Sequence, residues 1–179
     1  MIPLGARAAG EDGAEPRVTA GELLAVLGLR RWTLGVAESL TGGGVTSALV
    51  AVPGTSAVLR GGIVAYATDL KAGLLGVDAG LLAERGAVDP DVASQMAAGV
   101  RIATGADVGI STTGVAGPDP QDGNSPGVVY IAVSGPGIDQ VRRLDLSGSR
   151  PDVIAGAVAG ALELALGTIS DLSGAVAKG

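Results

Sequence analysis

Residues 32–50 read WTLGVAESLTGGGVTSALV, and this stretch decides the fold class. Its first part, Trp32 to Ala37, is short and apolar, as expected of a buried strand. Gly42 to Gly44 then introduce a segment of helical character that runs to about Val50. A strand that leads through a short turn into a helix is the basic unit of α/β proteins. Ser39 lies at this junction, where hydroxyls and free backbone N–H groups meet.

The alternation of helices and strands continues on both sides of this unit. Upstream, the capping-box spacing of Thr19 and Glu22 predicts a helix that begins at Thr19 and ends near Gly28. Downstream, Asp89 and Pro90 predict the start of a helix, and Gly105 its end. We also expect strands over residues 62–67, 108–113, 128–134 and 140–146, the last two joined as a hairpin by Gly135-Pro136-Gly137. A short helix around Lys71, capped at 68–69, and a closing helix over 151–169 complete the prediction. The pattern predicts a three-layer α/β/α fold with a mixed β-sheet.

The length of 179 residues suits a single domain with one compact core. Residues 1–17 lack periodicity and are expected to form a disordered leader, followed by one domain over 18–172 and a flexible tail over 173–179. The glycine- and proline-rich segment 114–127 is predicted to be a long loop. Loops of this length are usually functional or disordered.

Composition limits the class of partner. The formal net charge is −6, and basic residues cluster only as Arg30-Arg31 and Arg142-Arg143, so we expect a small-molecule partner and no nucleic acid. The chain has no cysteine and no signal-like apolar run at its N-terminus, which makes a cytoplasmic location the default expectation. No uninterrupted run reaches the 18 apolar residues of a membrane span, so no membrane association is expected.

Lys71 stands out because the chain has only one other lysine, Lys178, beside ten arginines. An amine loses its proton when desolvated, whereas guanidinium stays charged, so Lys71 is a candidate base. The absence of His and Cys excludes a Ser-His-Asp triad and a cysteine nucleophile. The ordinary alternatives are a capping role for Ser39, a solvated Lys71 and a buried packing role for Tyr66.

Four segments carry a more specific pattern together than any residue does alone. They are VAESLTGG at 36–43, GGIVAYATDLKAGLLGV at 61–77, GAVDPDVASQMAAGVR at 86–101 and TGVAGPDPQDGNSPGVVY at 113–130. In this order they resemble the CinA C-terminal domain family, whose members include nicotinamide mononucleotide deamidases. The resemblance implies a serine-lysine amidase with Ser39 as nucleophile, Lys71 as general base and Tyr66 as proton relay or orienting group. The chain departs from the family pattern at Leu40, where many relatives have cysteine, and in the longer run at 119–123.

The reaction implied by the resemblance converts nicotinamide mononucleotide to nicotinic acid mononucleotide and ammonia. The backbone N–H groups of Thr41, Gly42 and Gly43 are expected to serve the oxyanion or the substrate phosphate. The turn that contains Thr113, Gly114 and Gly117 is expected to supply the other half of the pocket. The family pattern implies that Arg150 contacts the phosphate; the ordinary alternative is a solvated arginine ahead of a helix.

No cofactor is expected. No metal is expected either, because Glu38 is a single carboxylate and one carboxylate is not a metal site. The expected partner is a phosphorylated nucleotide, with self-association into a homo-oligomer left open. Two alternatives to this function remain: a catalytically silent nucleotide-binding or competence-associated regulatory module, and an amidase that acts on another small amide.

Overall fold

The computed structural model describes residues 14–176, and its centre is a five-stranded sheet in the order β2-β1-β3-β4-β5. The strands are β1 (Leu34–Glu38), β2 (Leu59–Val64), β3 (Val108–Gly114), β4 (Val128–Gly135) and β5 (Ile138–Asp145). β1 is parallel to both of its neighbours, β2 and β3, while β4 is antiparallel to β3 and to β5. The sheet is therefore mixed, and the predicted hairpin joins β4 to β5.

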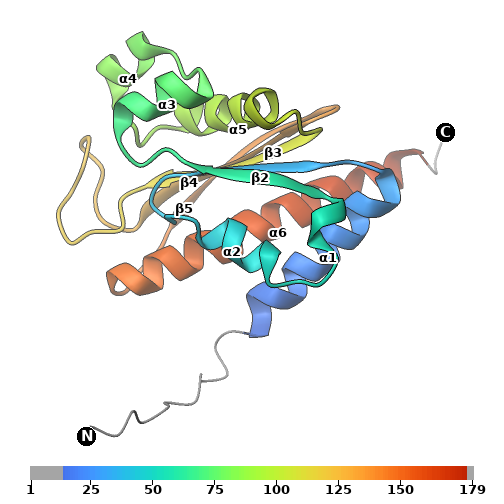
Figure 1. Ribbon diagram of the computed structural model, residues 1–179. Helices are drawn as coiled ribbons and strands as arrows, with labels where there is room; N and C mark the ends of the chain where they lie inside the picture. Colours follow the sequence, from blue (N-terminus) through green and yellow to red (C-terminus); the bar gives the residue numbers. More distant parts are fainter. Residues whose placement is uncertain (1–13, 177–179) are drawn as a thin grey trace, which may run out of the picture.

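Helices cover both faces of the sheet (Figure 1). On one face lie α1 (Ala14–Arg30), α2 (Gly44–Val50) and α6 (Arg150–Val176); on the other lie α3 (Thr68–Leu75), α4 (Ala79–Arg85) and α5 (Pro90–Thr104). A 3-10 turn, Thr55–Ala57, precedes β2. This arrangement confirms the predicted three-layer α/β/α fold.

Two apolar cores flank the sheet, one under each helical layer. Leu23, Leu27 and Leu162 are fully buried in the larger core, which α1 and α6 share with the sheet. Val92 and Met96 of α5 are fully buried in the smaller one. With almost no aromatic residues, these cores depend on close approach of backbones, since small side chains fill little space.

Gly109 of β3 shows how close this approach is. A Cβ atom there would lie 2.0 Å from the carbonyl oxygen of Ala97 in α5, well inside van der Waals contact. Glycine is thus required at this position for α5 to pack directly on the parallel strands. The helix in turn brings its first residues to the carboxyl end of β3.

The local signals around α5 are confirmed. The Asp89 side chain accepts hydrogen bonds from the N–H groups of Asp91 and Val92, Pro90 is the first helical residue, and Gly105 ends the helix in the left-handed conformation. Each of these interactions joins residues close in sequence, so the sequence alone specified them.

Both terminal helices are longer than predicted. α1 begins at Ala14, ahead of the expected capping box at Thr19, and Pro16 is accommodated because first-turn N–H groups have no intrahelical acceptor. α6 continues past Ile169 to Val176. Residues 14–17 and 173–176, which fall within the predicted leader and tail, thus belong to helices. The predicted domain limits stay a prediction, and residues 1–13 and 177–179 lie outside the described range.

Three smaller differences surround β2. The strand ends at Val64, not at Ala67, so Tyr66 lies in the turn that follows it. Thr68 is the first residue of α3 and not its cap; Ala67 occupies the cap position without a side-chain hydrogen bond. The short helix α4 was not predicted, although Asp78 caps it by accepting a hydrogen bond from the N–H of Leu81.

Helix α6 is long and apolar enough to cross a membrane by length and composition, with a mean hydropathy of 1.8 over Arg150–Leu172. Half of that window is buried, and α6 packs against α1, β3, β4 and β5. A core helix of an α/β domain has the same composition, so the apolar character of α6 is accounted for by its packing.

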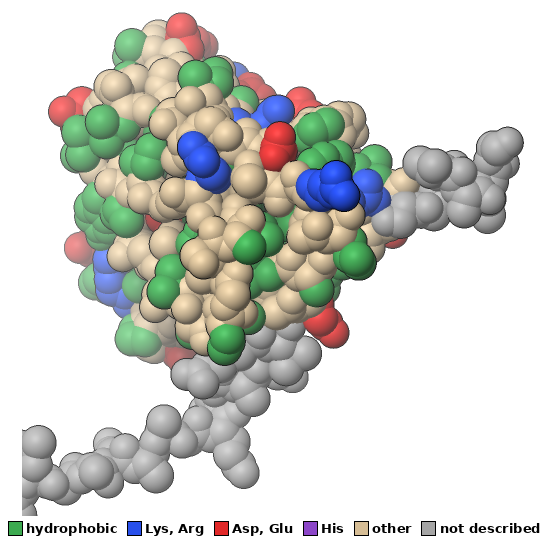
Figure 2. Space-filling view, turned by 45° about the vertical axis from the view of Figure 1, so that its right-hand side comes forward, with side chains coloured by type: hydrophobic (Ala, Val, Ile, Leu, Met, Phe, Trp, Pro, Cys, Tyr) green, Lys and Arg blue, Asp and Glu red, His purple; other side chains and the backbone are tan. Residues whose placement is uncertain are grey.

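Apolar side chains also reach the surface singly. Leu29 and Ile102 are 87% and 86% exposed. On the face in Figure 2, hydrophobic side chains are scattered among polar ones, and Lys and Arg form small groups instead of one broad patch. Single exposed apolar residues are ordinary on globular proteins.

Candidate active site

Ser39 follows directly after β1, at the carboxyl ends of the parallel strands. Its N–H donates to the carbonyl oxygen of Thr112 in β3, 3.0 Å away, which continues the strand pairing by one residue. The chain leaves β1 toward α2 on one face of the sheet and leaves β2 toward α3 on the other. Open α/β sheets bind ligands at such a switch in direction.

Lys71 of α3 is only 1% exposed and lies next to Ser39. Its Nζ is 3.0 Å from Ser39 Oγ, 2.8 Å from the carbonyl oxygen of Ala65 and 3.3 Å from that of Tyr66. The two carbonyls accept N–H groups, so the remaining tetrahedral position of Nζ points to Ser39. In the neutral amine, this position holds the lone pair.

Burial also changes the protonation of this amine. Desolvation lowers the pKa of Lys71 from 10.5 to about 8, against the opposing effect of the negative charge of Asp122. A base with a pKa near the working pH is effective at proton transfer. The pairing of a buried lysine with a serine hydroxyl is what a serine-lysine hydrolase requires. The alternative of a solvated Lys71 is wrong.

Tyr66 is placed differently from the prediction. Its side chain is 59% exposed, so a buried packing role is wrong. Its hydroxyl accepts a hydrogen bond from Arg150 Nη2 at 2.9 Å, and no hydrogen bond within residues 14–176 joins it to Ser39 or Lys71. The predicted proton relay is therefore not formed in this arrangement, and Lys71 contacts Ser39 directly. The backbone carbonyl of Tyr66, which orients Lys71, was not predicted to contribute.

Glu38 organises the turn between β1 and α2, a role that the sequence analysis missed. Its carboxylate is fully buried and accepts five hydrogen bonds, from the Thr41 hydroxyl, the Gly43 and Val45 N–H groups, and the N–H and hydroxyl of Thr46. A carboxylate at the start of a helix is a known favourable arrangement. A glutamate just ahead of a glycine-rich helix start was the available signal.

This arrangement corrects part of the predicted oxyanion site. The Gly43 N–H donates to Glu38, and the Gly42 N–H donates to the carbonyl oxygen of Ser39 at 3.1 Å. Both amides have acceptors, so their predicted role in substrate binding is wrong. The N–H groups of Leu40 and Thr41 have no acceptor among the described residues, and they directly follow Ser39 in the chain. These two amides are the ones available to an oxyanion.

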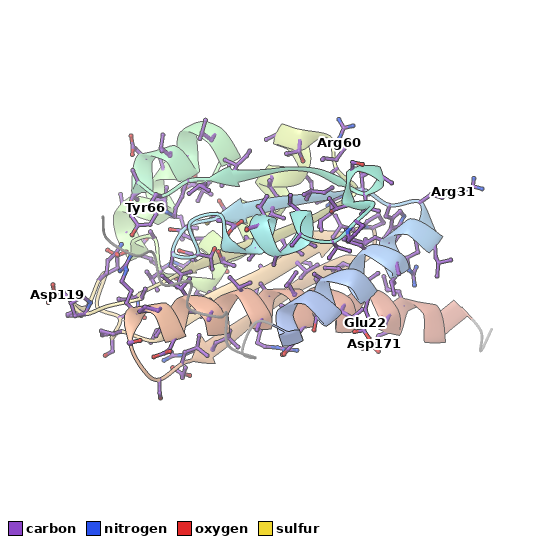
Figure 3. The ribbon with its side chains drawn as sticks, turned by 60° about the horizontal axis from the view of Figure 1, so that its bottom comes forward. Glu22, Arg31, Arg60, Tyr66, Asp119 and Asp171 are labelled. Carbon is purple, nitrogen blue, oxygen red and sulfur yellow. The ribbon has the colours of Figure 1, made fainter. Side chains whose placement is uncertain are left out.

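A pocket opens in front of Ser39 and encloses about 490 Å³ of empty space, part of it open to solvent. Its walls are Ser39, Leu40, Tyr66, Ala87, Val88, residues 113–117, Asp119, Gln121 and Arg150. Thr113, Gly114, Gly117 and Arg150 were predicted to contribute, whereas Ala87, Val88 and Gln121 were not. Figure 3 shows Tyr66 and Asp119 at this end of the molecule, with Arg31 and Arg60 at the opposite end.

Two of the predicted binding side chains also hold the pocket together. The Thr113 hydroxyl donates to the carbonyl oxygen of Ala87 at 2.6 Å, and Arg150 Nη1 donates to that of Gly117 at 2.8 Å. Arg150 uses two of its five N–H donors in its bonds to Gly117 and Tyr66, so three remain for a ligand. Among the described residues, no three His, Cys, Asp or Glu side chains come close enough to hold a metal ion.

Comparison with known proteins identifies the family of the chain. The sequence model of the CinA C-terminal domain matches residues 17–169. The chain belongs to the CinA C-terminal domain family. A "CinA-like protein" of Frankia casuarinae is 49% identical over 156 residues, which are 87% of this chain and 36% of that protein. A "putative competence-damage inducible protein" of Bacillus subtilis is 44% identical over 121 residues, 68% of this chain and 29% of that one. This CinA-family chain thus spans about a third of the length of such relatives.

Solved structures of CinA proteins have the same fold. The competence damage-inducible protein A of Klebsiella pneumoniae superposes with a TM-score of 0.84 at 32% identity, over 87% of this chain and 98% of that chain. A CinA superfamily protein of Escherichia coli superposes with a TM-score of 0.82 at 31% identity, over 89% and 94%. The three-layer fold and its mixed sheet are therefore those of the CinA superfamily.

Proposed function

We propose that this CinA-family domain is an amidohydrolase that converts nicotinamide mononucleotide to nicotinic acid mononucleotide and ammonia. One observation carries the proposal: the buried amine of Lys71, with its lowered pKa, lies 3.0 Å from Ser39 Oγ at the base of an open pocket. Amide hydrolysis needs an activated nucleophile, and this pair supplies one without histidine or cysteine.

In the first half of the reaction, Ser39 Oγ attacks the carboxamide carbon, and neutral Lys71 takes the hydroxyl proton. The carbonyl oxygen becomes an oxyanion, and the N–H groups of Leu40 and Thr41, which have no acceptor among the described residues, are the proposed donors to it. Lys71 then gives its proton to the amide nitrogen, the C–N bond breaks, and ammonia leaves. The acyl group remains on Ser39 as an ester.

In the second half, a water molecule attacks the ester carbon, and Lys71 accepts a proton from that water. The C–O bond to Ser39 breaks, and Ser39 Oγ takes the proton back from Lys71. The net change is one amide and one water to one carboxylic acid and one ammonia. The carbonyl oxygens of Ala65 and Tyr66 hold the amine in place through both halves.

Two features of the pocket support a phosphorylated substrate. Arg150 offers three unused N–H donors at the pocket wall, and guanidinium binds phosphate in a planar, two-pronged geometry. Ala116 and Gly117 also line the pocket, and their N–H groups have no acceptor among the described residues. Together they form a donor-rich wall that suits an anionic group.

The direct test is ammonia release from nicotinamide mononucleotide, compared with nicotinamide, nicotinamide riboside and glutamine, with the acid product identified by mass. The proposal predicts turnover of the mononucleotide, its loss in Ser39→Ala, and weaker turnover of the riboside. Binding of the nucleotide without ammonia release would instead indicate a silent regulatory module. Preferential hydrolysis of another of these amides would indicate a different substrate for the same Ser-Lys pair.

A further inference from the structure

The loop over residues 115–127 forms one wall of the pocket and is tied to the opposite wall. The loop extends away from the carboxyl end of β3 (Figure 1). The opposite wall contains Ala87 and Val88, which lie between α4 and α5 and are 2% and 4% exposed. A pocket between two connecting segments keeps its shape only if those segments are linked to each other.

Asp122 makes the first link. Its Oδ2 accepts a hydrogen bond from the N–H of Ala87 at 2.7 Å. Gly86 provides the space, because a Cβ atom at that position would lie 2.3 Å from the Asp122 carboxylate carbon. Asp122 itself has a φ of 51°, a left-handed conformation that Asp and Asn tolerate better than most residues.

Asn124 makes the second link. Its Nδ2 donates to the carbonyl oxygen of Val88 at 3.0 Å, while its backbone pairs with that of Gln121 through two hydrogen bonds of 2.8 and 3.0 Å. The loop therefore contacts both wall residues, at a donor of one and an acceptor of the other. The remaining polar group of Ala87, its carbonyl oxygen, is held by the Thr113 hydroxyl.

Asp122 also acts on the catalytic amine through its charge. Its carboxylate favours the ammonium form of Lys71 and so opposes the desolvation that lowers the pKa of that residue. Other charged groups on the elements around Lys71 include Asp69 on α3, Glu38 on β1, Arg60 on β2, Asp89 and Asp91 at the start of α5, Asp119 in the loop and Arg150 on α6. Glu38 is hydrogen-bonded to α2, Asp89 to the start of α5, and Arg150 to Tyr66. Asp122 is the residue whose negative charge raises the pKa of Lys71.

We infer that Asp122 is a positioning residue of the active site, because it latches the pocket loop to Ala87 on the opposite wall. This inference rests on the proposed Ser-Lys chemistry for its consequence in catalysis. The latch and the charge effect are both properties of the free protein, so they can be measured without a substrate.

The charge effect is tested by NMR titration of the lysine side chains. The chain has two lysines, so Lys71 is assigned by its loss in Lys71→Arg, and Lys178 serves as internal reference. Asp122→Asn keeps an oxygen that can accept from Ala87 N–H but removes the charge. We expect the titration midpoint of Lys71 to fall below the wild-type value in Asp122→Asn and to stay unchanged in the control Asp69→Asn. A midpoint in Asp122→Asn equal to or above that of wild type would overturn the charge effect.

The latch is tested by amide hydrogen exchange at Ala87, with Asp122→Asn compared with Asp122→Gly. Glycine removes the acceptor without straining the left-handed backbone. We expect Ala87 to stay protected in wild type and Asp122→Asn, and to exchange at least about tenfold faster in Asp122→Gly, the loss of one hydrogen bond of about 1.4 kcal/mol. Equal protection in all three proteins would disprove the latch.

The consequence for catalysis is read from steady-state kinetics. KM and kcat are compared at a pH above the acid limb, and the acid limb is located from the rate as a function of pH. We expect Asp122→Gly to raise KM more than it lowers kcat, because the pocket wall is loosened while Ser39 and Lys71 are intact. Asp122→Asn should keep the wild-type KM and move its acid limb to lower pH. A wild-type protein with no ammonia release would refute the proposed function alone, since exchange and titration would still decide the latch and the charge effect. If the wild type is active and both Asp122 variants have its KM and its acid limb, the positioning role alone is refuted.

Discussion

Replacement of Lys71 by arginine tests the proposed mechanism most directly, because it keeps a cation and removes the base. At pH 7, a pKa of about 8 leaves about one amine in ten neutral, whereas an ordinary lysine with a pKa of 10.5 would leave about one in three thousand. Burial of Lys71 thus raises the population of the active base about 300-fold. Arginine has a pKa above 12 and supplies no neutral form at these pH values.

We expect Lys71→Arg to lower kcat for nicotinamide mononucleotide by about 10²- to 10⁴-fold, the usual contribution of a general base. The wild-type rate should rise with pH through an acid limb centred near pH 8, the pKa of Lys71, and the variant should lose this limb. The assay is ammonia release between pH 6 and 10, with substrate above KM. Circular dichroism and melting temperature show whether the variant is folded.

Two controls separate chemistry from packing. Lys178→Arg makes the same substitution at the only other lysine and should leave rate and pH profile unchanged. Lys71→Met removes the amine without adding the bulk of guanidinium to a site that is 1% exposed, and should be as inactive as Lys71→Arg. A folded Lys71→Arg protein with wild-type kcat and an unaltered acid limb would refute the Ser-Lys mechanism, even if Ser39 proved essential.

Four further predictions concern the site and the packing that supports it. Ser39→Ala should abolish ammonia release while changing the free energy of unfolding by about 1 kcal/mol, and turnover within tenfold of wild type would exclude it as nucleophile. Arg150→Ala should raise KM for the mononucleotide about 10-fold or more but leave KM for the riboside nearly unchanged, since the lost hydrogen bonds are charge-assisted; equal effects on both substrates would count against phosphate contact. Lys71 has a folded pKa of about 8 and an unfolded value of 10.5, so the unfolded chain binds more protons between these values. As the pH rises over that range, denaturant titrations should show the free energy of unfolding of the wild type increasing by up to about 3 kcal/mol relative to that of Lys71→Met. Parallel curves of this free energy against pH for the two proteins would contradict the lowered pKa. Gly99→Ala should destabilise the fold by about 1–3 kcal/mol, because its Cβ would lie 1.8 Å from a backbone carbonyl oxygen of α3. The control Gly21→Ala, in a helix with free space around that position, should be neutral or stabilising. Similar melting temperatures for the two variants would argue against this packing.

The sequence predicted the fold where the signals are local. Asp89, Pro90 and Gly105 set the limits of α5, and the glycine-proline turn at 135–137 set the hairpin, because caps and turns bond residues a few positions apart. The predictions failed at chain ends and around β2, where the capping signals at Thr19 and Thr68 did not mark the cap positions of the helices. α1 and α6 were extended beyond the predicted ends, and Tyr66 fell outside the strand.

For the active site, residue chemistry identified Ser39 and Lys71 as candidates, and only the family resemblance implied that the two act together. They are 32 positions apart, and their contact depends on β1, β2 and α3 meeting at one edge of the sheet. The sequence likewise could not predict which hydrogen-bond partners the side chains of Tyr66 and Glu38 have. The Tyr66 hydroxyl bonds to Arg150, 84 positions away, and the Glu38 carboxylate accepts from the N–H of Gly43, one of the amides that the sequence had suggested for substrate.

The sequence by itself therefore determined which chemistry is available: a hydroxyl, one well-placed amine, no imidazole or thiol, and an alternation of strands and helices. The tertiary structure alone decided that the amine is desolvated, that two carbonyls aim it at Ser39, and that Asp122 links the two pocket walls. The physical reason is that local spacing determines the propensity for helix or strand, and residue type determines the proton affinity of a side chain in water. Burial, and the choice of partner for each polar group, depend on segments that are distant in the chain and adjacent only after folding.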